Sequence, residues 1–415
     1  MTRQPLDLFA AYGVELEYMI VDSDSLRVRP ISDQLLQSIA GEIVSDVELG
    51  DISWSNELAL HVIELKTTEP SPQLEPLAAR FQEHVGLINE RLGSLNARLM
   101  PTAMHPAMNP EQEMRLWPHD YNTVYEAFNR IFDCRGHGWA NLQSVHLNLP
   151  FANDDQFGRL HAAIRLLLPL LPALAASSPL MDGRASGLLD TRLDVYRHNS
   201  AKIPSISGQV IPEPVFSRSE YEREIFQRMY RDVAPYDPEG TLQHEWLNAR
   251  GAIARWDRNS IEIRVLDIQE CPAADLAILQ AIRDVLQWLV AERGSSYAQQ
   301  RSVPQAELVE LLGQTIRHAD EAVVNQPQLL AVLGYADERS LTAQEVWTRL
   351  MERATGGLSG SASINPELEL ILNEGVLARR MLQRVSDQPT DAEISALSRD
   401  LCDCLAQGRG LHGPR

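Results

Sequence analysis

The chain has 415 residues, of which 44% are hydrophobic and 23% charged, a composition typical of globular proteins with one large domain or two. With 37 Lys and Arg against 57 Asp and Glu, the formal net charge is -20, which argues against a general nucleic-acid-binding protein and against a basic membrane anchor. The longest apolar stretch, residues 166–176, is too short to span a bilayer.

Two periodicities mark the secondary structure: alternation of apolar and polar residues predicts strands, and apolar residues every three or four positions predict amphipathic helices. In chain order they predict a strand at 13–22, a helix at 32–44, one or two strands at 52–67, a helix at 75–98, a strand at 141–149, a buried helix at 155–176, a helix at 219–232 and strands at 251–256 and 260–267. From residue 273 the chain is predicted to be almost wholly helical. The small-residue run 356–363 interrupts it, and we expect a flexible loop there.

Short spacing between strands within 52–67 and 251–267 favours antiparallel pairs. We therefore predict an α+β fold, with an open, mainly antiparallel sheet and helices on one face. It would form a domain of residues 1–295, with a helical C-terminal region, 296–415, packed on it. Residues 182–216 are rich in Gly, Ser and Pro, and an irregular stretch of this length is usually a functional loop.

Two carboxylates lie side by side on the first predicted strand, where Glu15 and Glu17 share one face and Val14, Leu16 and Tyr18 share the other. Neighbouring carboxylates repel each other unless a cation lies between them. Oxygen ligands on a rigid strand suit a hard divalent cation such as Mg²⁺ or Mn²⁺. Taken alone, such a pair is more often an ordinary solvated strand face, and that alternative stays open.

The last predicted strand places Glu262 and Arg264 on one face, and an arginine beside a metal site suits a phosphate. A plain ion pair between the two side chains is the alternative. The strand at 141–149 carries a polar stripe of Ser144, His146 and Asn148. A histidine in this setting can be a metal ligand or simply a satisfied polar residue.

Glu57 and Glu64 complete the set of candidates. Their odd separation in sequence places them on opposite faces of one uniform strand, so both reach one site only through a bulge or if Glu57 precedes the strand. A surface position could explain any one of these residues. It explains less well why five carboxylates and one imidazole all occur on predicted sheet elements.

These motifs, in this order, resemble the glutamate–cysteine ligase type 2 family of bacterial carboxylate–amine ligases, whose catalytic domain is similar to that of glutamine synthetase. The resemblance is carried by residues 13–17, by Glu57 with 64–67, and by 144–148, 177–184 and 261–267. No motif beyond about residue 295 matches. The resemblance implies a glutamine synthetase-like catalytic fold.

It also implies an ATP-dependent ligase that joins the γ-carboxylate of glutamate to an amine, with cysteine favoured as in glutathione biosynthesis, through an acyl phosphate. ATP and Mg²⁺ or Mn²⁺ would be the cofactors. Small-molecule substrates would be the partners, with no nucleic acid and no membrane, and a homo-oligomer is allowed. The implied metal ligands are Glu15, Glu17, Glu57, Glu64, His146 and Glu262. Arg264 would clamp a phosphate or carboxylate, Arg184 would be an anion-binding loop arginine, and Arg192 and Arg197 are further candidates in the same loop.

Residues 196–214 depart from the commonest members of the family, because this segment is longer and more distinctive and lies in the expected substrate loop. A different amine or acid therefore stays open. A non-catalytic relative would be marked by lost ligands, which the retained glutamates argue against. A metal-dependent hydrolase would usually use more His and Asp. Four scattered cysteines and no apolar signal core predict a cytoplasmic protein without disulfides.

Overall fold

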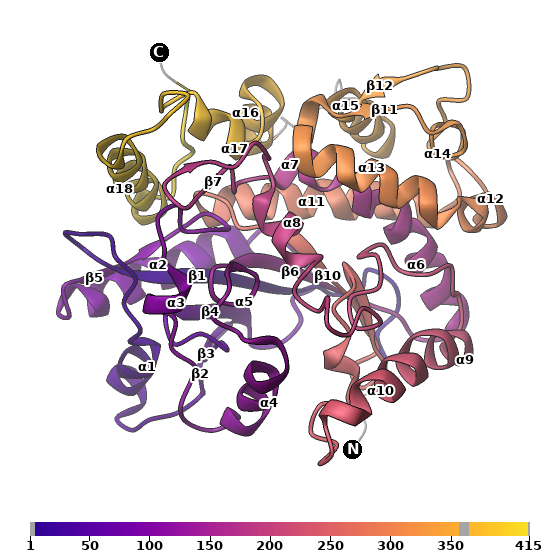
Figure 1. Ribbon diagram of the computed structural model, residues 1–415. Coiled ribbons are helices and arrows are strands. Elements are labelled where there is room, and N and C mark those ends of the chain that lie inside the picture. Colours follow the sequence, from indigo (N-terminus) through magenta and orange to yellow (C-terminus); the bar gives the residue numbers. More distant parts are fainter. Residues whose placement is uncertain (1–4, 357–364, 414–415) are drawn as a thin grey trace.

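The computed structural model describes residues 5–356 and 365–413, and its centre is one eight-stranded sheet (Figure 1). The strand order is β2-β3-β4-β1-β6-β10-β9, with β5 paired to the C-terminal half of β1, and all of these pairs are antiparallel. The predicted α+β class with an open, mainly antiparallel sheet is confirmed. The strands are β1 (Gly13–Asp22), β2 (Asp46–Leu49), β3 (Ile52–Asn56), β4 (Val62–Thr67), β5 (Ala97–Met100), β6 (Ser144–Pro150), β9 (Ala252–Arg255) and β10 (Ser260–Asp267).

Two small hairpin sheets lie outside it, β7 (Leu180–Met181) with β8 (Arg184–Ala185), and β11 (Val323–Val324) with β12 (Leu341–Thr342). The α-helices are α1 (Ser32–Ala40), α2 (Leu77–Gly93), α3 (Pro110–Glu113), α4 (Asn122–Phe132), α5 (His137–Ala140), α6 (Asp154–Leu167), α7 (Pro172–Ala175), α8 (Thr191–Tyr196), α9 (Arg218–Tyr221), α10 (Gln227–Val233), α11 (Pro272–Val290), α12 (Tyr297–Ser302), α13 (Gln305–His318), α14 (Pro327–Val332), α15 (Ala343–Ala354), α16 (Pro366–Glu374), α17 (Leu377–Leu382) and α18 (Asp391–Gln407). Shorter turns are η1 (Leu168–Leu170), the π-helical η2 (Glu222–Phe226), η3 (Ala234–Tyr236), η4 (Glu245–Leu247) and η5 (Ala319–Glu321).

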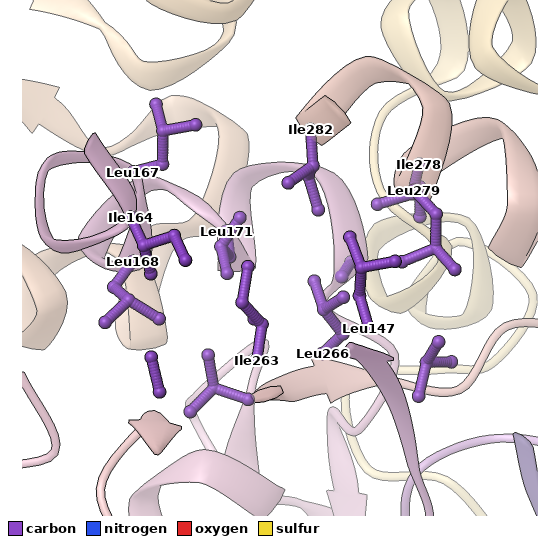
Figure 2. Close-up of a cluster of buried hydrophobic side chains, with 14 of the residues drawn as sticks. Leu147, Ile164, Leu167, Leu168, Leu171, Ile263, Leu266, Ile278, Leu279 and Ile282 are labelled. Carbon is purple, nitrogen blue, oxygen red and sulfur yellow. The ribbon is translucent and has the colours of Figure 1, made fainter. Parts of the chain in front are cut away.

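One face of the sheet forms the main core, because alternation along β1 sends Val14 and Leu16 to that face, where both are fully buried. The long helices α2, α6 and α11 contribute to the same apolar cluster. Figure 2 shows the part of the core that lies over β6 and β10: Leu147, Ile263 and Leu266 from the strands, Ile164, Leu167, Leu168 and Leu171 from the α6–η1–α7 segment, and Ile278, Leu279 and Ile282 from α11.

The opposite face is polar only in part. Along β1 it carries Glu15 and Glu17, but Met19 and Val21 further along the strand belong to a second apolar cluster. That cluster includes residues from β5 and from the segments around α3 and α5, such as Met100, Met108, Cys134 and Ala140. Apolar packing therefore closes this end of the face and confines the polar stretch to the first half of β1.

Two predicted helices differ from the structure for local reasons. The helix expected at 75–98 ends at Gly93, and after a turn at Asn96, which has a positive φ of 51°, the chain continues as β5. The helix expected at 155–176 is divided into α6, η1 and α7, because Pro169 and Pro172 have no N–H for the helical hydrogen bonds.

The predicted irregular stretch 182–216 is largely turns, but it also contains α8 and many of its residues are buried. The side chain of Arg250, which is buried, forms hydrogen bonds with the second half of this stretch. The guanidinium donates Nε to Glu213 at 2.6 Å and Nη2 at 2.7 Å, and Nη1 reaches the carbonyl of Ser205 at 3.2 Å. A bidentate pair of this kind gives the segment a fixed position.

The C-terminal helices share the main core: α15 and α16 pack on α11, and α18 packs on β5 and α2. Trp347 of α15 donates its indole N–H to the carbonyl of Leu170 at 2.8 Å. Apart from Gly356, the expected loop at 356–363 lies outside the described residues. Among the helices that the structure describes, none has the length and apolar character needed to cross a membrane.

Candidate active site

Strand register brings the predicted carboxylates together on the polar face. Glu17 of β1 lies opposite Glu64 of β4, Glu64 lies opposite Ser55 of β3, and Ser55 lies opposite Asp46 of β2. Residues paired in this way project to the same side of a sheet, with neighbouring side chains about 5 Å apart. One polar row therefore crosses four strands.

The adjacent row is centred on Glu15, which lies opposite Lys66 of β4 on one side and His146 of β6 on the other. On the next strand pair, Glu262 of β10 lies opposite Asn148 of β6. Asn148 donates its side-chain amide to Glu15 at 3.0 Å. The predicted polar stripe of β6 thus connects the carboxylates of β1 to that of β10.

His146 is the centre of this network. Its Nδ1 lies 2.7 Å from Glu15 and 3.9 Å from Glu262, and its Nε2 lies 3.0 Å from the hydroxyl of Ser144, which in turn donates to Glu17. Burial alone would lower the pKa of His146, but the hydrogen bond and charge of Glu15 raise it to about 9. Burial would raise the pKa of Glu15, but the hydrogen bond and charge of His146 lower it to about 2. The two form a buried imidazolium–carboxylate pair at neutral pH.

The ionised forms of Glu64 and Glu57 are stabilised less than that of Glu15. Burial first, and then the charge of Glu15, raises the pKa of Glu64 to about 7, although Lys66 lies 3.1 Å away. Glu57 follows β3 and precedes β4, so the second of the two predicted routes to the site is the one observed. Burial, with the charges of Glu64 and Glu17, raises the pKa of Glu57 well above its ordinary value.

The donor set fits a divalent cation. One ligand atom each from Glu15, His146 and Glu262 can be chosen so that all three lie within 4.8 Å of one another. The pKa values of Glu57 and Glu64 are raised by burial first and then by the charges of neighbouring carboxylates, and positive charge at this face would offset both. Carboxylates and one imidazole are ligands suited to Mg²⁺ or Mn²⁺. Such an ion would supply positive charge to the cluster and would take the place of a proton on His146.

Arg264 and Glu262 form an ion pair, which the sequence left open as the alternative to a metal ligand beside a phosphate-binding arginine. Arg264 Nε lies 3.2 Å from Glu262, and Nη1 donates to the carbonyl of Asn248 at 3.4 Å. Sequence reasoning missed Arg255 of β9, whose guanidinium approaches the other oxygen of Glu262 at 3.7 Å. Arg255 lies opposite Ser260 in the β9–β10 hairpin, so the register of this hairpin was the signal that could have located it. Two guanidinium groups therefore border one carboxylate.

The loop arginines lie elsewhere. Arg192 is fully buried and donates Nε to Asp267 at 2.5 Å, while Asp267 also accepts from the backbone of Ser177 and the hydroxyl of Ser178. Arg192 therefore locks α8 to the end of β10. Arg184 is exposed on the β7–β8 hairpin, and its side chain makes no hydrogen bond or ion pair with any residue that the structure describes.

The family model of glutamate–cysteine ligase family 2 matches residues 11–400. An uncharacterized protein of Archaeoglobus fulgidus is 34% identical over 394 residues, 95% of this chain and 98% of that protein. Among solved structures, a glutamate–cysteine ligase from Francisella tularensis in complex with AMP matches with a TM-score of 0.60 and 12% identity, over 94% of this chain and 88% of that one.

A bifunctional glutathione synthetase from Pasteurella multocida matches with a TM-score of 0.57 and 14% identity, over 96% of this chain. This chain spans only 53% of that synthetase. At such low identities the two solved structures show a common fold alone, which is the glutamine synthetase-like class that the sequence motifs implied.

Proposed function

From the premise that the chain belongs to glutamate–cysteine ligase family 2, we propose that it forms a γ-glutamyl amide through an acyl phosphate. Membership of this family and the observed fold both support an ATP-dependent carboxylate–amine ligase. The observation that carries the proposal is that strand register gathers four glutamates and His146 on one polar face, with Glu57 and Arg264 beside them. A site that brings the phosphates of ATP beside a substrate carboxylate needs this combination of metal ligands and guanidinium groups.

The proposed reaction has two steps. An oxygen of the substrate γ-carboxylate attacks the γ-phosphorus of ATP, and ADP leaves. The amine nitrogen then attacks the acyl carbon, phosphate leaves, and the nitrogen gives up a proton. Cysteine is the first candidate for the amine, and the Francisella ligase of the same fold supports that choice.

Each charged residue of the face has a part in this proposal. Divalent cations, when bound, would neutralise phosphate charge and hold the reacting groups in line. Arg264 can turn from Glu262 to an anionic phosphate, since guanidinium groups bind both, and Arg255, which is held by Asp257, would add positive charge beside it. The metal ligands that we propose are Glu15, Glu17, Glu57, Glu64, His146 and Glu262.

Water must be kept from the acyl phosphate until the amine arrives. The segment 205–213 is held in place by Arg250, and Arg184, which is exposed on β8, would be the arginine of the predicted loop that is available to an anion. We place this chemistry in the cytoplasm, because all four cysteines are buried and free, as expected in a reducing compartment.

Hydroxylamine tests the proposal without knowledge of the amine, because it traps an acyl phosphate as a hydroxamate. With Mg²⁺, ATP and glutamate, the protein should produce ADP and γ-glutamyl hydroxamate in equal amounts. Glu262→Gln should abolish both products, and Glu48→Gln, an exposed position on β2 of the same sheet, should leave them unchanged. Absence of hydroxamate from the folded wild-type protein with glutamate and with other amino-acid carboxylates would refute the proposal.

The amine is then identified by replacing hydroxylamine with a panel of amines and determining the masses of the products by mass spectrometry. Cysteine should give the highest rate. If another amine is preferred, the acyl-phosphate chemistry stands and only the amine assignment changes, in line with the distinctive segment 196–214.

A further inference from the structure

Lys66 is one of only two lysines in the chain, and it lies at the edge of the carboxylate cluster. Its ammonium group is 3.1 Å from Glu64, 3.0 Å from Asp46 and 2.8 Å from the hydroxyl of Ser55. Its backbone lies opposite Glu15, whose charge it also stabilises. The side chain is 32% exposed, so the ammonium group can be reached from solvent.

Glu64 therefore has a cation already. Both Lys66 and the hydroxyl of Ser55 approach the same oxygen of this carboxylate, Oε2, at 3.1 and 2.6 Å. A divalent cation at Glu64 would lie close to the ammonium group, and two positive charges at that distance repel each other in a partly buried site. The ammonium group and the cation must compete for Glu64.

Asp46 offers Lys66 a second position. It lies on β2, at the edge of the sheet, and its side chain is 43% exposed, against 9% for Glu64. A lysine has a flexible four-carbon stem and a compact charge, so it can keep contact with Asp46 while it moves away from Glu64. An anion in the cleft would be a third partner for the displaced ammonium group.

We propose that Lys66 acts as the counter-cation of Glu64 in the metal-free protein, gives up Glu64 when a divalent cation binds there, and then binds the phosphates of the nucleotide. The inference rests on the proposed function, because it needs both a divalent cation and a polyphosphate at this face. A lysine that is simply a structural partner of Glu64 would have a different signature, since its removal would disorganise the ligand and weaken metal binding.

The test measures binding, without turnover. Free Mn²⁺ is followed by electron paramagnetic resonance in the absence of nucleotide, and binding of a non-hydrolysable ATP analogue is followed by calorimetry with Mg²⁺ present. Lys66→Met should bind Mn²⁺ about 10-fold more tightly and the ATP analogue about 10-fold more weakly than the wild type, the scale of losing one charged neighbour. Lys66→Arg should stay close to the wild type for the nucleotide.

The other lysine is the matched control. Lys202 donates to the carbonyl of Ile131 at 3.0 Å and lies over the ring of Tyr236, so Lys202→Met should leave the affinity for Mn²⁺ unchanged. Asp46→Asn gives an independent check if Lys66→Met does not fold. It removes the second partner of the ammonium group, which should then stay on Glu64, and Mn²⁺ binding should weaken several-fold.

Opposite signs for the two affinities in Lys66→Met support the inference. Weaker Mn²⁺ binding in Lys66→Met, or unchanged affinity for both ligands, overturns it, as does unchanged Mn²⁺ binding in Asp46→Asn. The proposed function is judged separately by the wild type: if it binds both Mn²⁺ and the nucleotide, a failure of the lysine variants concerns Lys66 alone. If the wild type binds neither ligand, both the inference and the proposed function are wrong.

Discussion

Replacing Glu64 or Glu15 by glutamine should change the stability of the metal-free protein in opposite directions, although we propose both as ligands of one site. Ionisation of Glu64 is less favourable in the folded state than in the unfolded chain, because burial and then the charge of Glu15 raise its pKa to about 7. Glu15 is favoured when ionised, because His146 lowers its pKa to about 2 in spite of burial. Glutamine therefore removes an unfavourable charge at position 64 and a favourable one at position 15.

The size of both effects follows from the shifts. One pKa unit corresponds to about 1.4 kcal/mol. The pKa of Glu64 rises from an ordinary 4.5 to about 7, and that of Glu15 falls from 4.5 to about 2, so each shift amounts to at most about 3 to 4 kcal/mol of folding free energy. The two groups interact, which makes these figures ceilings.

The sign depends on pH in a different way for each residue. Folded Glu64 binds its proton more tightly than the unfolded chain does, so the wild type loses stability as the pH rises from 4.5 through 7. The benefit of Glu64→Gln should grow across that window and be complete above it. The stability that Glu15 contributes is present above pH 4.5 and is lost as the pH falls toward 2, so Glu15→Gln should be destabilising throughout the neutral range.

Urea unfolding with a chelator present, followed by tryptophan fluorescence at about pH 5, 6, 7 and 8, measures these differences. Near pH 8 Glu64→Gln should be more stable than the wild type and Glu15→Gln less stable. Near pH 5 the advantage of Glu64→Gln should almost vanish. Excess Mg²⁺ should stabilise the wild type most and cancel that advantage. An effect of Glu64→Gln that does not change with pH, or equal destabilisation by both variants, would refute this account of the cluster.

Three further predictions concern arginines. Arg264→Lys keeps the charge but loses the two-pronged geometry, so turnover should fall roughly 10²-fold with an unchanged circular dichroism spectrum; wild-type turnover would make Arg264 merely structural. Arg250→Met removes the anchor of Glu213, and limited proteolysis should then cut the segment 182–216 faster than in the wild type; an equal rate would show that other contacts hold it. Arg184→Ala should leave the stability in urea unchanged, because the side chain is exposed. It should raise the KM of the acid substrate or uncouple ATP hydrolysis from amide formation. A normal KM and normal coupling would show that Arg184 is not part of the site.

The strands of the site could be predicted because one of their faces is apolar and the other carries charged residues. Along β1 and β10 the buried Leu16 and Ile263 alternate with Glu17 and Glu262, and this alternation indicates both the strand and the shared face. It also limits where Glu57 can lie, since its odd separation from a second glutamate requires a bulge or a position before the strand. Local periodicity thus identifies which residues face the site.

Local periodicity does not show which of these residues become neighbours. His146 meets Glu15 through the pairing of strands 131 residues apart in sequence, and that register depends on the whole sheet. The irregular pairing of β10 with β6 between Ile263 and Leu266 has no signal in composition. Arg192 shows the same limit, because its partner Asp267 lies 75 residues away and reaches it through a segment of turns.

The ion pairs of the polar face and the chemistry that we propose for it depend on the same charges. Glu262 now lies 3.2 Å from Arg264, an arrangement that by itself could be a structural ion pair. Each charge in such a partly buried pair needs a replacement partner before the other can leave, because an unpaired buried charge is costly. A divalent cation for Glu262 and a phosphate for Arg264 would satisfy both at once, whereas either ligand alone leaves one group unpaired. Cation and nucleotide should therefore bind with positive cooperativity, each raising the affinity of the other by the same factor.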